Sequence, residues 1–273
     1  MSEVGSRFKE ARQRVIERRK ETVSGLKKSF ENTGNISLFA GRFFKEVFLP
    51  PYEFREFILQ CYWVGYKSFP LVAITGFIMG LVLTLQSRPT LASFGAESWL
   101  PGMVSLSLIK EIGPVITGLI CAGKIGSGIG AELGSMKVTE QIDAMEVSAV
   151  NPFKFLVVTR ILACTFMIPL LIVFADAIGI VGSFIGANIN TKVSFFLFIN
   201  SAMGVIEFSD LVPAIIKSFF FGFMIGLIGT YKGYTAANGT ESVGKAANSA
   251  VVSASLALFV VDMLAVQITD IFM

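Results

Sequence analysis

The chain has 273 residues, of which 53% are hydrophobic and 16% are charged, and its mean hydropathy is +0.68. Soluble domains are about 45–50% apolar and about 25% charged, so this composition excludes an ordinary soluble protein and indicates an integral membrane protein. Histidine is absent, which excludes Ser-His-Asp and Cys-His catalytic sites and removes the usual zinc ligand. The net charge is only +3, but more than half of the 23 Lys and Arg residues precede Pro70.

Cys61, Cys121 and Cys164 lie far apart, within or beside apolar runs. Their spacing fits neither a disulfide framework nor a metal site, so we interpret them as small buried apolar residues. The run 118–124 is similar to a P-loop, but Ile125 replaces the required Ser or Thr. The run also lies within an expected membrane span, where a nucleotide could not bind. We therefore expect no metal and no cofactor to be bound by this chain.

Residues 1–33 are strongly charged and contain no apolar run, so they are expected to form a cytoplasmic extension. Anionic lipid is a better partner for this basic segment than nucleic acid, because a membrane domain follows it. Residues 34–67 mix aromatic with charged side chains, which is typical of an amphipathic segment lying in the membrane interface. A soluble amphipathic helix packed on a partner is the alternative.

Residues 68–273 are expected to form the membrane domain. Five apolar runs are long enough to cross a bilayer, and they cover residues 68–86, 102–129, 155–187, 211–230 and 249–268. The fold class is therefore an all-α integral membrane protein with five transmembrane helices preceded by an amphipathic interfacial helix. A short charged segment, Glu140–Glu146, separates the second and third spans and is well placed to receive force from a soluble partner.

Charged residues inside spans are costly and mark candidate functional sites. Lys110 and Glu111 are adjacent in the second span, while Asp176, Lys217 and Asp262 lie in later spans. The alternative for the Lys110–Glu111 pair is a position near the membrane boundary, from which both side chains reach water. Gly76, Gly80, Gly126 and Gly130 have the spacing that lets membrane helices approach closely.

The distribution of Lys and Arg predicts the orientation. The N-terminal region and the segments 124–160 and 231–248 carry most of the positive charge, whereas 87–101 and 188–210 contain only Arg88 and Lys192. The N-terminus and the 135–150 segment are therefore expected in the cytoplasm, and the C-terminus on the outer side.

The run from Glu111 to Pro152 (EIGPVITGLICAGKIGSGIGAELGSMKVTEQIDAMEVSAVNP) resembles the signature of MlaE-type permeases, the membrane subunits of ABC transporters linked to MCE proteins. The resemblance extends from about Gly41 to the end of the sequence. It includes the G-x-x-x-G…LQ pattern that ends at Gln86 and the glycine-containing loop around 233–246.

The resemblance implies a non-catalytic subunit of the bacterial inner membrane that spans it several times and forms a homodimer. Two copies of an ABC ATPase, which hold ATP and magnesium, would bind on the cytoplasmic side, and an MCE lipid-binding protein on the periplasmic side. The complex would move phospholipid between the inner membrane and the outer envelope.

The resemblance also implies site residues. A helix that couples to the ATPase would span Met136 to Val147, with contacts from Met136, Glu140, Gln141, Asp143, Met145 and Glu146. A lipid pocket at the dimer interface would have Lys110 and Glu111 at its charged end. Its apolar wall would consist of Phe77, Ile78, Leu81, Leu85, Leu106 and Leu108.

Three other functions are alternatives to this one. An ion-coupled secondary transporter would use Glu111, Asp176 and Asp262 as a relay, but five spans with no visible inverted repeat argue against it. An intramembrane enzyme would need a nucleophile and a base, and this sequence contains no such pair. For a purely structural membrane anchor of a soluble complex, Asp143→Arg is not expected to uncouple transport while the subunits stay associated.

Overall fold

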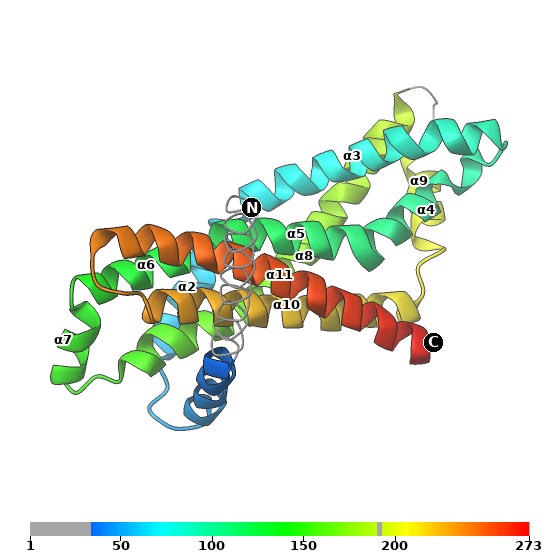
Figure 1. Cartoon of the computed structure of the whole chain (residues 1–273). Helices are drawn as coiled ribbons and strands as arrows, with labels where there is room; N and C mark the ends of the chain where they lie inside the picture. The colour runs from blue at the N-terminus through cyan, green and yellow to red at the C-terminus, as the bar shows by residue number, and fades with distance from the viewer. Residues whose placement is uncertain (1–33, 190–192, 273) are drawn as a thin grey trace, which may run out of the picture. The chain divides into compact units, whose positions relative to one another are not determined.

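The structure is a computed structural model that describes residues 34–189 and 193–272. Within these ranges every regular element is helical. Five helical stretches are long and apolar enough to cross a membrane (Figure 1): Phe54–Ser93, Glu97–Val138, Phe153–Asn188, Phe208–Tyr234 and Thr240–Ile271. The predicted all-α class with five spans is confirmed.

The chain divides into two compact units, Met1–Phe48 and Leu49–Met273. In the first unit, residues 34–47 are helical, and the rings of Phe43 and Phe44 meet edge to face at 5.3 Å. The expected charged extension, residues 1–33, lies outside the described residues. All five spans belong to the second unit, which contains the elements described below.

The first span consists of α2 (Phe54–Gly65) and α3 (Phe69–Ser93), with a turn at residues 66–68 between them. With 25 residues, α3 is about 37 Å long and crosses a hydrocarbon layer of about 30 Å by itself. The apolar run predicts an end at Gln86, but the helix continues to Ser93. Backbone hydrogen bonding does not depend on apolar side chains, so polar helix-forming residues extend the span beyond the lipid-facing part.

The second span is interrupted by two π-helical turns. Its segments are η1 (Glu97–Trp99), α4 (Leu100–Ser107), η2 (Leu108–Ile112), α5 (Gly113–Cys121), η3 (Ala122–Gly126) and α6 (Ser127–Val138). One residue, Gly113, separates η2 from Pro114, whose missing N–H cannot bond the carbonyl of Lys110 four residues earlier. This carbonyl instead accepts a hydrogen bond from the side chain of Lys217.

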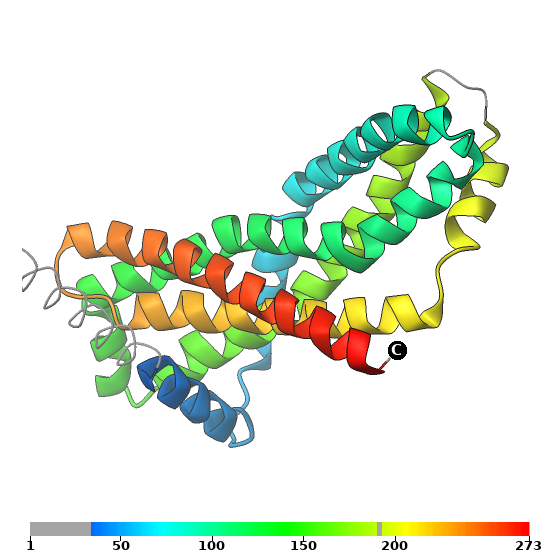
Figure 2. The ribbon, with the colours of Figure 1, turned by 45° about the vertical axis from the view of Figure 1, so that its right-hand side comes forward.

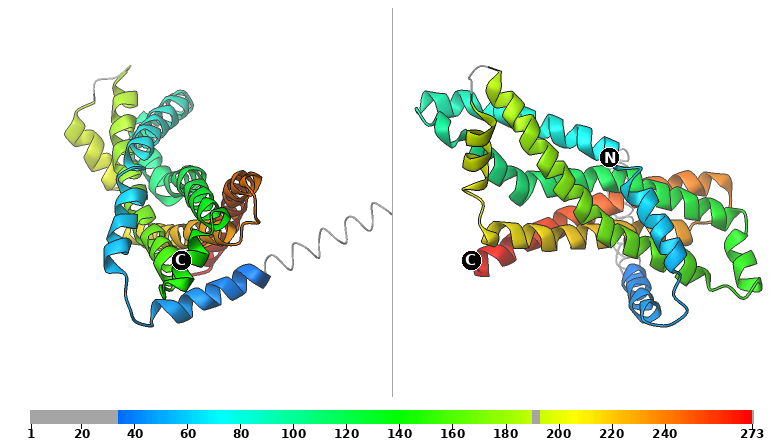
Figure 3. Two further views of the ribbon diagram at one scale, coloured as in Figure 1. Left: turned by 90° about the vertical axis from the view of Figure 1, so that its left-hand side faces the viewer. Right: turned by 180° about the vertical axis from the view of Figure 1, so that it is seen from behind.

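The third span, η4 (Phe153–Val158) followed by α8 (Thr159–Asn188), packs against α2, α3 and α10. Figure 3 shows α3 and α8 side by side. Their backbones touch because small residues face each other. A side chain on Gly80 would overlap the carbonyl of Gly179, and one on Gly76 would lie 2.6 Å from the carbonyl oxygen of Ala175.

The loop expected between residues 188 and 210 contains a helix, α9 (Phe195–Met203). Two of its side chains, Phe198 and Ala202, are fully buried in an apolar cluster with Leu100 and Val104 of α4. Nine residues are too few to cross a membrane, and α9 packs on the α4 end of the second span.

The last two spans are α10 (Phe208–Tyr234) and α11 (Thr240–Phe272), which lie side by side (Figure 2). The polar loop expected over 231–248 is reduced to residues 235–239. Polar residues from Thr240 onward are already helical, with an exposed ion pair of 2.8 Å between Lys245 and Glu241 one turn apart. Both helices therefore extend past their apolar parts.

Candidate functional site

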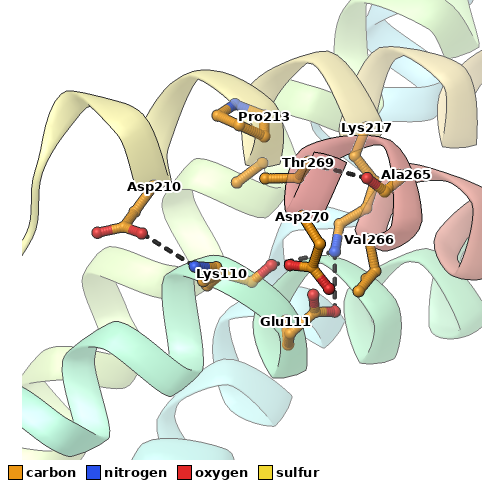
Figure 4. A pocket seen from close by; sticks show the side chains of 10 residues that line it. Lys110, Glu111, Asp210, Pro213, Lys217, Ala265, Val266, Thr269 and Asp270 are labelled. Atoms are coloured by element: carbon orange, nitrogen blue, oxygen red, sulfur yellow. Dashed lines mark hydrogen bonds and ion pairs between the residues drawn. The ribbon is translucent and has the colours of Figure 1, made fainter. Parts of the chain in front are cut away.

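A cluster of charged side chains joins the second, fourth and fifth spans around Lys217 of α10, which is only 4% exposed. Its ammonium group donates hydrogen bonds to Glu111 Oε2 at 2.9 Å and to the backbone oxygen of Lys110 at 3.0 Å. Asp262 Oδ1 of α11 lies 2.9 Å from the same nitrogen, at an angle that makes the contact an ion pair rather than a hydrogen bond. Figure 4 shows Lys217 pointing between the two neighbouring helices.

The sequence explains why the ammonium group lies here. Pro114 cannot donate to the carbonyl of Lys110, so this acceptor is available to Lys217. An uncompensated ammonium in the membrane interior would be very costly, and two carboxylates and one carbonyl offset that cost. The result is an electrostatic link between three spans.

Lys110 points away from Lys217 and pairs with Asp210 of α10 at 3.1 Å. Asp210 also accepts a hydrogen bond from the N–H of Glu207 at 3.3 Å in the capping box that begins α10. A small cavity of about 30 Å³, enough for one water molecule, lies between these groups. It is lined by Lys110, Glu111, Asp210, Pro213, Ala214, Lys217, Ala265, Val266, Thr269 and Asp270.

The apolar residues expected beside this pair lie elsewhere. Leu108 is fully buried and packs against Gly179, while Ile78 and Leu85 are exposed on the outer face of α3. The α3 backbone at Phe77 and Leu81 faces α8 at Gly182, and Leu106 is half-buried on α4. Of the described residues that line the small cavity, none belongs to this apolar set.

Asp176, the third carboxylate of the expected relay, does not join the cluster. It lies on α8, is 8% exposed, and presses one carboxylate oxygen against the backbone of Gly113. That oxygen has no hydrogen-bond partner among the residues that the structure describes. Glu111 and Asp262 thus share one lysine, whereas Asp176 is held in a separate, tightly packed environment.

The expected coupling segment contains a turn. α6 ends at Val138, residue Glu140 adopts a left-handed conformation with φ 57°, and a separate helix α7 covers Gln141–Val147. Met136 therefore lies on α6 rather than on the short helix. On α7, Ile142 is 1% exposed and anchors the helix.

The side chains assigned to the coupling surface differ in exposure. Gln141 and Glu146 are exposed, whereas Met145 packs partly against the main core. Asp143 is half-exposed and pairs with Lys137 of α6 at 2.8 Å. The outward face of α7 is therefore accessible, and it combines these polar side chains with Val147, which is 90% exposed.

Two glycines of the second span lie at helix contacts. A side chain on Gly130 would come within 3.2 Å of the carbonyl oxygen of Ala246 in α11, and one on Gly126 within 3.7 Å of Ile225 in α10. The second span therefore packs closely on both later spans.

A comparison with known protein families matches residues 57–268 to the permease MlaE family. The chain belongs to the MlaE permease family. Relatives include a "Probable ABC transporter permease protein" of Rickettsia felis, 35% identical over 89% of this chain and 92% of the relative, and one of Synechocystis, 34% identical over 76% and 78%. The "Protein TRIGALACTOSYLDIACYLGLYCEROL 1, chloroplastic" of Arabidopsis thaliana is 28% identical over 84% of this chain and 65% of its own length.

Membership of this family makes the chain an MlaE-type ABC transporter permease subunit, a non-catalytic multi-pass membrane component that works with a partner ATPase.

The sequence singles out the Lys110–Glu111 pair, places Glu111 and Asp262 in one alternative relay, and marks Lys217 as a charge inside a span. It does not join Lys217 to these two carboxylates, and it does not single out Asp210. A signal for the pairing of Lys217 with Asp262 is present in the sequence, because a buried ammonium group requires carboxylates. The fourth span contains one lysine and the fifth contains one aspartate, each about six residues from the same end of its apolar run. Sequence alone does not show which helices lie next to each other, so the pairing had to come from the structure.

Proposed function

We propose that this MlaE permease moves phospholipid between the bacterial inner membrane and the outer envelope. The family match over residues 57–268 is the observation that carries the proposal. The Arabidopsis relative, whose name is that of a glycerolipid, supports a lipid as the transported molecule. The energy would come from ATP and magnesium bound by the partner ATPase.

The proposed arrangement places two copies of the permease side by side, with the ATPase pair on the α7 side and an MCE lipid-binding protein on the opposite side. The excess of Lys and Arg on the α7 side supports a cytoplasmic location for this face and for the N-terminus, with a periplasmic C-terminus. No nucleic acid takes part.

The proposed lipid pocket lies between the two copies, along the first and second spans. Ile78 and Leu85 project outward from α3 and offer an apolar surface that a second copy can share. We place Lys110 and Glu111 at the charged end of this pocket and the half-buried Leu106 in its wall. Leu108 is fully buried, and α3 faces α8 at Phe77 and Leu81, so these three residues would line the pocket only after the helices move. A cleft that is apolar with charge at one end suits a molecule with acyl chains and a charged head group.

In the proposed cycle, closure of the ATPase pair displaces α7 through Gln141, Asp143 and Glu146. α6 is continuous with the rest of the second span, so the displacement reaches Glu111 and its shared partner Lys217. A change in this link between three spans would alter the width of the lipid pocket and release the lipid.

The test is an affinity purification of the permease from native membranes in mild detergent, followed by mass spectrometry of proteins and lipids. We expect an ABC ATPase and an MCE protein in stoichiometric amounts, and ATP-dependent phospholipid transfer by the recovered complex. Recovery of the permease alone, in a detergent that preserves other ABC complexes, would contradict the proposal. Transfer that depends on a proton gradient instead of ATP would support the secondary transporter.

A further inference from the structure

A second, larger cavity lies at the joint between α2 and α3, on the side of the second span toward α7. Its volume is about 400 Å³, which is large enough for a small organic group. It is lined by Gln60, Trp63, Val64, Lys67, Ser68, Lys124, Ile125, Gly128, Ile129 and Glu132. Each of its two walls therefore combines a lysine with apolar side chains: Lys67 with Trp63 and Val64 on the α2 side, and Lys124 with Ile125 and Ile129 on the second span.

The two cations of this cavity have no anionic partner among the described side chains. Lys124 donates to the backbone oxygen of Lys67, which the break between the helices leaves available. The Lys67 ammonium lies 2.8 Å from the centre of the Trp63 indole ring. The one carboxylate in the wall, Glu132, is already paired with the buried guanidinium of Arg160 at 2.8 Å.

The charged cluster around Lys217 offers a direct contrast. There both ammonium groups are matched by carboxylates at 3.1 Å or less. An anion arriving at Lys217 would have to displace Glu111 or Asp262, whereas an anion arriving at Lys124 would meet unmatched positive charge. Of these two basic pairs, the one at the α2–α3 joint is therefore available for an anionic ligand.

The depth of the cavity corresponds to the level of lipid head groups. Measured along the second span from the exposed Trp99, Lys110 is about 16 Å away and Lys124 about 37 Å away, against a hydrocarbon thickness of about 30 Å. Lys110 thus lies inside the hydrocarbon layer and Lys124 just beyond its far side. Lys67, directly before the crossing helix α3, lies at the same level.

Aromatic side chains mark this level independently. Tyr62, Trp63 and Tyr66 are each about half exposed or more, and the two tyrosine rings stack at 5.1 Å. Tyr and Trp concentrate where the hydrocarbon layer meets the head groups. The cavity therefore opens where a lipid phosphate lies.

Gly128 keeps part of the cavity open. A side chain added there would meet no atom within 4 Å, although Gly130, two residues later, is closely packed. Packing therefore does not require glycine at position 128. Because Gly128 lines the cavity, a larger side chain at this position would take up space beside Lys124.

We propose that this cavity binds the phosphate-bearing head group of an anionic glycerophospholipid from the leaflet on the α7 side. Lys124 and Lys67 hold the phosphate, and Val64, Ile125 and Ile129 contact the glycerol and the first acyl carbons. The inference rests on the proposed lipid-transport function and adds to it a separate binding station about 21 Å along the second span from Lys110.

The test is native mass spectrometry of the full-length permease in detergent, titrated with phosphatidylglycerol, phosphatidylcholine or inorganic phosphate. We expect phosphatidylglycerol to be retained more tightly than phosphatidylcholine. Lys124→Gln should weaken its binding about tenfold, since one charge-assisted contact is lost, and Gly128→Leu should weaken it at least as much. The matched control is Gly123→Leu, because position 123 is on the same span and is equally open but does not line the cavity.

Equal retention of the two lipids, or equal losses in Gly128→Leu and Gly123→Leu, would overturn the inference. Displacement of phosphatidylglycerol by inorganic phosphate at similar concentration would also overturn it, because the site would then bind a free anion. ATP-dependent transfer by the wild-type complex is measured in parallel. If transfer occurs and the cavity variants bind normally, only the cavity proposal fails, and if no transfer occurs, the proposed function itself fails.

Discussion

At the scale of single residues, Lys217 shows how a membrane protein accommodates a buried cation. The ammonium group donates a hydrogen bond to one backbone carbonyl and forms ion pairs with two carboxylates, and these partners come from two other spans. Removing one member of such a group leaves the others charged and unpaired, which is costlier than removing the whole group. The energetic effect of a substitution therefore depends on which member is changed.

Lys217→Met tests this dependence. It leaves Glu111 and Asp262 close together without a cation, so we expect a loss of about 3–5 kcal/mol in unfolding free energy and a clear fall in the thermal unfolding temperature. The control, Lys245→Met, removes an exposed lysine from a pair one turn apart and should change stability by about 0.5 kcal/mol or less. Similar shifts in both variants would show that the buried cluster does not stabilise the permease.

The residues of this cluster illustrate what a sequence can reveal. The Lys110–Glu111 pair could be singled out because opposite charges are rare within an apolar run. The partner of Glu111 is 106 residues away, and no local pattern encodes this distance. The unmatched charge of Lys124 was equally hidden, because its environment depends on the break between α2 and α3.

At the scale of secondary-structure elements, the contact of α3 with α8 depends on the absence of side chains. Gly80 faces the backbone of Gly179, and beside it Thr84 and Ser183 share a hydrogen bond of 2.6 Å between their hydroxyl groups. Close approach of this kind is a main source of helix association in membranes.

Gly80→Ala is expected to force α3 away from α8. The new methyl group would meet backbone atoms that cannot move alone, so we expect a destabilisation of about 1–3 kcal/mol, measured as a lower thermal unfolding temperature in detergent. Gly123→Ala, at an open helical position, is expected to be neutral or slightly stabilising. The packing explanation would fail if the two variants behaved alike.

The helix α7 provides a second test at this scale. Asp143→Arg should abolish ATP-driven lipid transfer, because it reverses the charge on the face proposed to contact the ATPase. The exposed pair with Lys137 contributes at most about 1 kcal/mol, so the unfolding temperature should stay within about 4 °C of the wild type. Asp143→Asn, which removes the charge without reversing it, should retain part of the transfer activity. Full activity of Asp143→Arg would exclude this position from the interface.

Element boundaries were harder to predict than element types. Hydropathy locates the lipid-facing part of a helix, and it therefore missed the polar first turns of α11 and the last turns of α3. It also missed α9, whose nine residues are too short to read as a span. The ends of α3 and α11 are helical because backbone hydrogen bonding does not require apolar side chains. The helix α9 is held by local packing on α4.

At the scale of the whole molecule, composition and five apolar runs were sufficient to predict the number of spans. The excess of Lys and Arg in the segments on one side of the membrane also predicts the orientation. The orientation can be tested in a variant without the three native cysteines.

A single cysteine at Asn238, between α10 and α11, should react with a membrane-impermeant maleimide in spheroplasts only after permeabilisation. A single cysteine at Ser98, between α3 and α4, should react without it. The two positions are matched because both are exposed at the ends of spans, Asn238 in the connection after α10 and Ser98 in the short turn η1 before α4. The reverse labelling pattern would place α7 outside the cytoplasm and would remove the ATPase contact proposed for it.

The π-helical turns of the second span have an evolutionary consequence. Such a turn holds one residue more than an α-helical turn, so a residue can be gained or lost there without rotating the parts of the helix that are already packed. Elsewhere in the span, a single insertion or deletion would turn all following side chains by about 100° and would separate Lys110, Lys124 and the glycines from their neighbours. Length differences between relatives in this span are therefore expected to fall at 108–112 and 122–126 and to be rare between them.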